Sequence, residues 1–111
     1  MDYLEFIETP LFTKQRIELF TEDEYQAFQT ELIQNPSAGV IMRDTGGCRK
    51  IRFATGNKGK SGGVRIIYYW QEPGGRIWLF TVYPKNQKDN LSNSEKSQLK
   101  AAVGMIKGGQ I

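Results

Sequence analysis

Six basic residues between positions 49 and 65 are the side chains of this sequence best suited to chemistry on a polyanion. They are Arg49, Lys50, Arg52, Lys58, Lys60 and Arg65. No acid lies between Thr45 and Gln71. Arginine keeps its charge and can pair with phosphate through two donors, while lysine binds phosphate as a point charge. Like charges on one face of a sheet repel each other unless an anion neutralises them. The pattern predicts a phosphate-binding surface, with nucleic acid as the expected partner.

Some of these residues allow a second interpretation. Lys58 and Lys60 lie in a glycine-rich stretch, where they could bind phosphate or simply keep an exposed loop soluble. Among the aromatic residues, Tyr69 and Tyr83 are expected to be exposed; each ring could stack on a base, or each hydroxyl could only reach water. Trp78 and Phe80, in contrast, are expected in the core; both belong to a strand-like run.

The charges of the 111 residues are separated along the chain, although the net charge is only +3. Residues 1–44 contain nine acids and three bases, a net charge of −6. Residues 45–88 contain nine bases and one acid, a net charge of +8, and the rest adds +1. A surface without an electrostatic role usually mixes its charges. The basic second half is therefore the half expected to meet a polyanion.

Composition excludes several kinds of site. The sequence has no histidine, so a His–Asp triad, a histidine metal site and imidazole-based RNase chemistry are impossible. The single cysteine, Cys48, excludes an internal disulfide, and without a histidine base it is expected to be a small sheet residue rather than a nucleophile. Residues 54–61 have a loose phosphate-loop pattern, but a strand follows where such a loop needs a helix. NTP hydrolysis is not expected.

The same composition gives an expectation for location. One cysteine suits a reducing compartment, and no stretch has the apolar length of a membrane span. The first nine residues hold three acids, unlike the basic start of a signal peptide. We therefore expect a cytoplasmic protein without membrane contact.

Caps and periodicity predict the elements that must position the basic side chains. Thr9 before Pro10 is typical of a helix start, and Thr21 and Ser92 each precede a glutamate by three residues, as in a capping box. The expected elements are a strand over 3–7, helices ending near residues 20 and 34, strands over 49–53, 64–70 and 76–83, and a helix from Ser92 to before Gly108. The fold class is α+β: an N-terminal helical hairpin packed on a small antiparallel sheet with a C-terminal helix, in one domain over 1–111.

Three runs in this order, together with the residues between them, resemble the toxins of type II toxin–antitoxin modules. They are Thr45–Arg52, Gly59–Tyr69 and Tyr83–Lys88. The sequence is most similar to the HigB-2-type branch of the RelE/ParE superfamily, over nearly the whole chain. The resemblance implies a RelE-like fold and a ribosome-dependent endoribonuclease that cleaves mRNA in the decoding site and stops translation. It implies no cofactor, and a cognate antitoxin, HigA-like with a DNA-binding helix-turn-helix.

The resemblance also assigns roles to residues. Lys50 and Arg52 match paired basic residues of RelE, Arg65 matches its catalytic arginine, and Lys85 falls where RelE has a further arginine. The residues expected to bind substrate are Arg49, Lys58, Lys60, Tyr69, Tyr83 and Asn86. Leu91 departs from the pattern, because RelE has there a tyrosine that acts on the 2′-hydroxyl. The general base is therefore open, with Tyr83, Lys85 and Asn86 as substitutes.

Metal-free RNA cleavage through the 2′-hydroxyl suits these side chains. The hydroxyl must lose its proton, charge on phosphorus must be stabilised and the 5′-oxygen must gain a proton. Arg52 and Arg65 would stabilise charge, and Lys50 could transfer a proton. Two other functions remain open: a ParE-like inhibitor of DNA gyrase, and a nucleic-acid-binding protein without activity.

Overall fold

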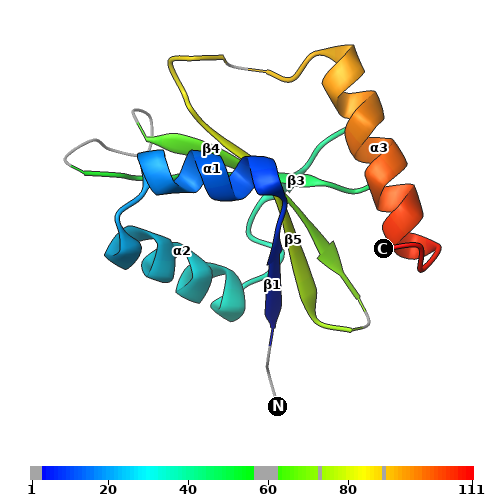
Figure 1. Cartoon of the computed structure of the whole chain (residues 1–111), viewed down its shortest axis with the longest axis horizontal. Helices are drawn as coiled ribbons and strands as arrows, with labels where there is room; N and C mark the ends of the chain where they lie inside the picture. Colours follow the sequence, from blue (N-terminus) through cyan, green and yellow to red (C-terminus); the bar gives the residue numbers. More distant parts are fainter. Residues whose placement is uncertain (1–3, 57–62, 73, 89) are drawn as a thin grey trace.

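A computed structural model of the chain describes residues 4–56, 63–72, 74–88 and 90–111, which form three helices and five strands (Figure 1). In chain order they are β1 (Glu5–Glu8), α1 (Pro10–Leu19), α2 (Glu22–Gln34), β2 (Val40–Ile41), β3 (Arg49–Phe53), β4 (Val64–Gln71), β5 (Arg76–Pro84) and α3 (Asn93–Lys107). The predicted α+β fold with a helical hairpin, a sheet and a C-terminal helix is confirmed. The sequence did not predict β2, because two residues carry no periodicity.

The predicted helix starts are confirmed. Thr9 caps α1 by accepting a hydrogen bond from the backbone N–H of Phe12 at 3.0 Å, and Pro10 begins the helix. Reciprocal capping boxes start the other two helices, formed by Thr21 with Glu24 and by Ser92 with Glu95. Side chains within three residues thus satisfy N–H groups that the first turn of each helix leaves without a partner.

The sheet has the strand order β1-β5-β4-β3-β2. Strands β3, β4 and β5 pair antiparallel, as predicted, and β2 adds to β3 in the same sense. Strand β1 pairs parallel with β5, with Phe6 opposite Ile77. The chain leaves β1 through the helical hairpin and returns at the opposite edge, so β1 and β5 become neighbours only when the meander is complete. Periodicity predicts a strand here but not its distant partner.

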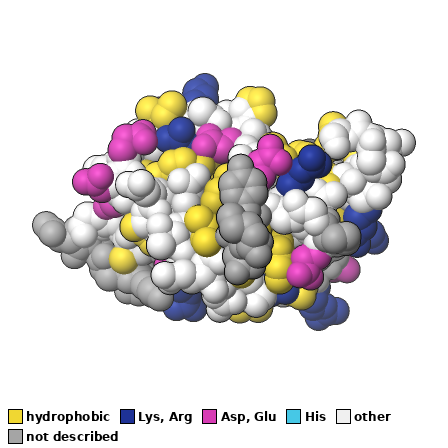
Figure 2. Space-filling view, turned by 90° about the horizontal axis from the view of Figure 1, so that it is seen from below, with side chains coloured by type: hydrophobic (Ala, Val, Ile, Leu, Met, Phe, Trp, Pro, Cys, Tyr) yellow, Lys and Arg dark blue, Asp and Glu magenta, His cyan; other side chains and the backbone are white. Residues whose placement is uncertain are grey.

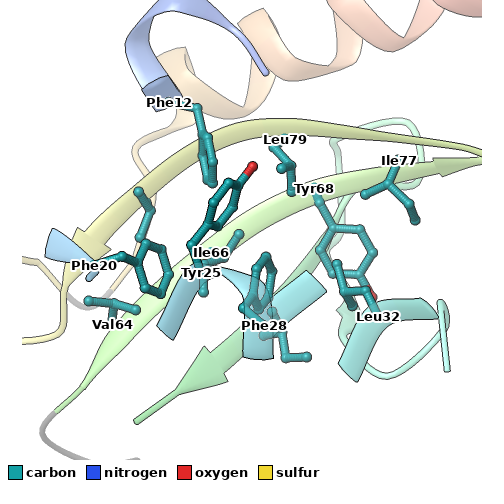
Figure 3. Packing of buried hydrophobic residues seen from close by; sticks show 12 residues of the cluster. Phe12, Phe20, Tyr25, Phe28, Leu32, Val64, Ile66, Tyr68, Ile77 and Leu79 are labelled. Atoms are coloured by element: carbon teal, nitrogen blue, oxygen red, sulfur yellow. The ribbon is translucent and has the colours of Figure 1, made fainter. Parts of the chain in front are cut away.

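One core lies between the helical hairpin and one face of the sheet (Figure 3). Three residues of α2 are buried there: Tyr25, Phe28 and Leu32. Phe20, just before the N-cap of α2, packs on Tyr25 with ring centroids 5.8 Å apart, as in a hydrophobic staple. The sheet residues of this core include Ile51, Val64, Ile66, Tyr68, Ile77, Leu79 and Val82.

A second core lies between α3 and the other face of the sheet. Val103 and Ile106 of α3 are buried with Ile67 and Tyr69 of β4. Alternate residues of β4 thus enter opposite cores, which is why its sequence is almost continuously apolar. Around Tyr69 the sheet is covered on both faces.

A half-buried carboxylate joins β1 to both helices of the hairpin. Glu8 accepts hydrogen bonds from Thr13 at 2.6 Å, from Arg16 at 3.0 Å and from the Tyr25 hydroxyl at 2.5 Å. Burial opposes the charge of this carboxylate, but the three donors together hold the pKa of Glu8 below its usual value. The hairpin is therefore fixed to the sheet by polar as well as apolar contacts.

The acidic and basic halves of the sequence do not give every face of the molecule a single sign of charge. On the face that Figure 2 shows, acidic and basic side chains lie among one another, with apolar side chains between them. Attraction of a polyanion would therefore come from the local placement of the basic residues rather than from the overall balance of charge.

Candidate active site on the sheet

The strongest candidate site is a row of directly opposed residues across β3, β4 and β5. Arg52 lies opposite Arg65, and Arg65 lies opposite Tyr83. Directly opposed residues of antiparallel strands project from the same face, with Cβ atoms about 4.5–5.5 Å apart. The prediction that the two arginines share a sheet face is confirmed, and their role in chemistry stays a prediction. A bound phosphate would offset the repulsion between them.

The two arginines differ in burial. Only 7% of Arg65 is exposed, and its Nη1 donates a hydrogen bond to the carbonyl of Val64 at 3.3 Å. Arg52 is exposed. Because arginine stays charged inside proteins, Arg65 provides a fixed positive charge at the base of the row. Arg52 provides one that can reach a phosphate from solvent.

Lys50 lies two residues before Arg52 and therefore on the same face of β3. Its partner on β4 is Ile67, a fully buried residue of the core under α3. Lys50 itself is half-buried. Along β3, Lys50 thus lies between the part of the sheet covered by α3 and the arginine row.

Lys85 follows β5 at the end of the sheet that carries the arginine row. Its backbone N–H donates to the carbonyl of Gly63 at 3.1 Å, next to the Val64–Pro84 pair. Gly63 must be glycine, because a Cβ there would lie 2.1 Å from the Phe53 carbonyl oxygen. The side chains of Lys85 and of Asn86 are exposed. The structure therefore brings Lys85 to the same end of the sheet as Arg52 and Arg65.

The prediction that Tyr69 and Tyr83 are exposed is wrong. Tyr69 is 9% exposed and Tyr83 is 2% exposed, because both rings lie in the core under α3. Neither ring offers a free face for stacking on a base. Trp78 and Phe80, expected in the core, pack against it while staying partly exposed. The register shifts by one residue between the Ile67–Thr81 and Tyr68–Leu79 pairs, so Phe80 has no directly opposed partner.

The structure does not bring Arg49 to the row. Its side chain lies on the hairpin side of β3 and donates from Nη1 to the carbonyls of Ser37 at 3.1 Å and Gly39 at 2.8 Å. Tyr68, opposite Arg49, accepts from Gly39 and donates to Pro36. Arg49 thus holds the segment after α2 instead of a substrate. Lys58 and Lys60 lie outside the described residues.

Sequence reasoning missed two residues beside the row, Lys88 and Glu95. Lys88 Nζ donates to Glu95 Oε2 at 2.5 Å and lies 5.0 Å from the ring centroid of Tyr83. The hydrogen bond from Lys88 is the main reason that the pKa of Glu95 is below its usual value. The capping box of Ser92 and Glu95 is visible in the sequence, but it indicates only a helix start and not the second partner of Glu95, which is Lys88. Leu91 is buried under α3, and its aliphatic side chain cannot act as a base.

Two other kinds of site receive no support from the described residues. Cys48 is fully buried, and burial raises the pKa of its thiol to about 11. This confirms Cys48 as a small buried residue rather than a nucleophile. No group of three or more Cys, Asp or Glu side chains in the described part of the chain could hold a metal ion.

An apolar pocket of about 250 Å³ lies between the start of α1, β5 and α3. Its walls include Leu11, Phe80, Leu99 and Ala102. None of the predicted site residues lines it, so the proposed chemistry is not built around this pocket. Across the described ranges, no helix combines the length and apolarity needed to cross a membrane.

The structure is that of a small α+β protein that holds two arginines opposite each other on one face of its sheet. A family model described as "RelE toxin of RelE / RelB toxin-antitoxin system" matches residues 11–108. The chain therefore belongs to this family of toxins. Its partner, as for a toxin of such a system, is an antitoxin.

Solved structures agree with this assignment. The chain is similar to a double arginine-to-alanine mutant of E. coli toxin RelE in the free state, with a TM-score of 0.58 and 17% identity, over 93% of this chain and 98% of that one. It is also similar to the isolated E. coli RelE toxin in a P21 crystal form, with a TM-score of 0.54 and 17% identity, over 90% and 99% of the two chains. At this identity the similarity shows the RelE fold and nothing finer.

Proposed function

We propose that the protein is a ribosome-dependent endoribonuclease that cleaves mRNA in the decoding site and so stops translation. The observation that carries this proposal is the direct opposition of Arg52 and Arg65 on one sheet face. Lys50 shares that face, and Lys85 lies at the same end of the sheet. A toxin that acts only through protein contacts has no need of like charges held so close together.

The proposed reaction uses the 2′-hydroxyl of the mRNA as the nucleophile. Its oxygen forms a bond to the neighbouring phosphorus while the bond from phosphorus to the 5′-oxygen breaks, leaving a 2′,3′-cyclic phosphate and a 5′-hydroxyl. Arg65, fixed and buried, stabilises the charge on phosphorus, and Arg52 orients the phosphate. One proton leaves the 2′-hydroxyl and one reaches the 5′-oxygen, with Lys50 and Lys85 as the proposed groups. The reaction needs no metal ion.

Dependence on the ribosome is expected because these side chains include no strong general base. The sequence has no histidine, and the buried Leu91 stands where the resemblance would place the tyrosine of RelE. A site without a strong base gains most when another body holds the mRNA in a reactive geometry, since positioning can supply about 7–11 kcal/mol of a barrier. We place the protein in the cytoplasm, where this partner is found.

The proposal also includes the branch of the family to which the toxin belongs and the kind of antitoxin that inhibits it. The runs Thr45–Arg52, Gly59–Tyr69 and Tyr83–Lys88 support the HigB-2-type branch, which implies a HigA-like antitoxin with a helix-turn-helix. The open reading frame next to the gene tests this directly. A neighbour without a helix-turn-helix would place the toxin in another branch.

The function is tested with purified ribosomes, a defined mRNA and the toxin, with cleavage mapped by primer extension. We expect cuts in the codon of the decoding site, no cuts without ribosomes, and no cuts by Arg65→Ala. Supercoiling by DNA gyrase is measured in parallel. Intact mRNA with inhibited gyrase would identify a ParE-like inhibitor, and intact mRNA with retained RNA binding would identify a non-catalytic binding protein.

A further inference from the structure

The segment between β5 and α3 is held at both ends by contacts around the arginine row. At its start, Lys85 N–H donates to the Gly63 carbonyl at 3.1 Å, and Gln87 N–H donates to the Pro84 carbonyl at 3.1 Å. At its end, Lys88 bonds to Glu95 at 2.5 Å. Lys85 and Asn86, two of the predicted site residues, lie between these anchors. The position of Lys85 and Asn86 thus depends on the contacts at both ends of the segment.

The second anchor reaches the site through Tyr83. The Lys88 ammonium lies over the Tyr83 ring, 5.0 Å from its centroid, where a cation is attracted by the ring. Tyr83 is directly opposite Arg65 and almost fully buried. A continuous series of contacts therefore runs from Glu95 through Lys88 and Tyr83 to the buried arginine.

Glu95 makes more contacts than its capping role requires. Its Oε1 accepts from the Ser92 N–H at 2.8 Å, which completes the capping box. Its Oε2 is the oxygen that binds Lys88. Glutamine also serves in a capping box, so helix α3 could start with either residue. Only the carboxylate provides a charged acceptor for Lys88.

We propose that Glu95 and Lys88 are positioning residues of the active site, which hold Lys85 and Asn86 against the Arg52–Arg65 row. The inference rests on the proposed function and deepens it, because it assigns part of the catalytic geometry to the start of α3. Neither residue touches the substrate. Loss of their contact leaves the arginine row in place and frees the segment that completes it.

The test compares three variants with one control. Glu95→Gln keeps the capping box but turns an amide nitrogen toward Lys88, which cannot accept its hydrogen bond. Lys88→Gln removes the cation, and Lys88→Arg keeps both the ion pair and the contact with Tyr83. Lys100→Gln is the control for Lys88→Gln, because it removes the same positive charge from an exposed position on α3. Each is measured for single-turnover cleavage on ribosomes, ribosome affinity, thermal unfolding and amide hydrogen exchange.

We expect Glu95→Gln and Lys88→Gln to lower the cleavage rate about 10- to 100-fold, the range for a misplaced group in a catalytic site. Ribosome affinity should change no more than it does in Lys100→Gln. Amide exchange should accelerate at residues 85–88 and stay unchanged at residues 99–106 in α3. Lys88→Arg should retain the cleavage rate of the wild type.

Each contrary result has a definite meaning. Unchanged exchange at residues 85–88 in Glu95→Gln would overturn the proposal, whatever the activity. Faster exchange with an unchanged cleavage rate would overturn it too, because the segment would then be mobile without consequence. A loss of cleavage in Lys88→Gln that is matched by Lys100→Gln would overturn the role of Lys88 and show a general effect of lost positive charge. If the wild type cleaves no mRNA, the proposed function fails, and the exchange data still decide whether the two residues hold the segment.

Discussion

Glu24 accepts a hydrogen bond from the backbone N–H of Gly56 at 2.6 Å, across 32 positions of the sequence. The same carboxylate caps α2 through its other oxygen, which accepts from Thr21 N–H at 2.8 Å. The bond from Gly56 is the main reason that the pKa of Glu24 is below its usual value. One residue of the acidic hairpin therefore anchors the chain where it leaves β3, shortly after Arg52.

The first prediction concerns this anchor. Glu24→Gln keeps a side chain that fits a capping box but removes the charged acceptor of Gly56 N–H. We expect faster amide exchange at Gly56 and only a small loss of thermal stability, since the bond is exposed to solvent. Asp23→Asn, which removes an exposed acid from the same helix turn, is the control. Equal exchange at Gly56 in both variants would show that Glu24 does not hold this position.

The second prediction separates two arginines of the same strand. Arg52→Ala should lower mRNA cleavage about 100- to 1000-fold, the usual cost of losing one donor to a developing charge. Its stability should be unchanged or slightly higher, because repulsion with Arg65 is removed. Arg49→Ala should instead lower the free energy of unfolding by about 1–3 kcal/mol, because the carbonyls of Ser37 and Gly39 lose their donor.

Urea unfolding and ribosome cleavage assays on both variants check this separation. At a temperature where Arg49→Ala is folded, its cleavage rate should match that of the wild type. If Arg49→Ala is stable but no longer cleaves mRNA, Arg49 binds substrate, as the sequence predicted. An Arg52→Ala with full activity would remove the arginine row from the mechanism.

The third prediction is a pH dependence of stability from Glu8. Its pKa is lowered in the folded state, so its bonds stabilise the fold fully above the ordinary value of 4.5. That contribution is lost as the pH falls below 4.5 and through the lowered folded-state pKa. Glu8→Gln should therefore destabilise the protein by about 1.5–3 kcal/mol at pH 7 and by much less near pH 3.

Urea unfolding of both proteins at the two pH values measures the effect. Glu5→Gln serves as a control, because the ion pair of Glu5 with Arg76 at 3.2 Å is exposed and should matter little. A difference between wild type and Glu8→Gln that stays constant with pH would mean that the charge of Glu8 is not what stabilises the hairpin.

Local sequence patterns predicted the elements well, because their causes are local. Thr9, Thr21 and Ser92 each satisfy N–H groups within three residues, so the helix starts could be read from spacing alone. The strands that carry Arg52 and Arg65 followed from alternation and β-branched residues. That both arginines lie on one face followed from the same alternation, but their direct opposition also depends on the register of β3 and β4, which periodicity does not give.

The residues that were misplaced depend on contacts distant in the sequence. Alternation puts Tyr83 on the face of Arg65 but does not show that α3 covers that face. Arg49 is bound by carbonyls ten and twelve residues away, in a segment without a regular pattern. The bond between Lys88 and Glu95 forms only when α3 folds back on the sheet. Burial and pairing of this kind come from tertiary contacts, which hydrophobic periodicity in the sequence does not predict.

The last prediction concerns the antitoxin. The arginine row must meet mRNA, so an inhibitor with acidic groups near Lys50, Arg52 or Arg65 would block that surface directly. Opposite charge also accelerates association, which suits a toxin that harms its own cell when free. We expect amides of residues 48–56, 63–70 and 83–88 to gain protection from exchange in the complex. Association should slow as salt is added, because the attraction is screened.

The alternative is an antitoxin that binds the helical hairpin and inhibits only by keeping the toxin out of the ribosomal cleft. In that case residues 4–34 would gain protection while the three sheet ranges would not. The variant Arg52→Ala distinguishes the two independently of exchange, because it should weaken binding only if the antitoxin contacts the row. Lys100→Ala, which removes a charge from the exposed side of α3, controls for net charge. An antitoxin that binds both variants as tightly as the wild type and protects only the hairpin would establish steric exclusion in place of direct occlusion.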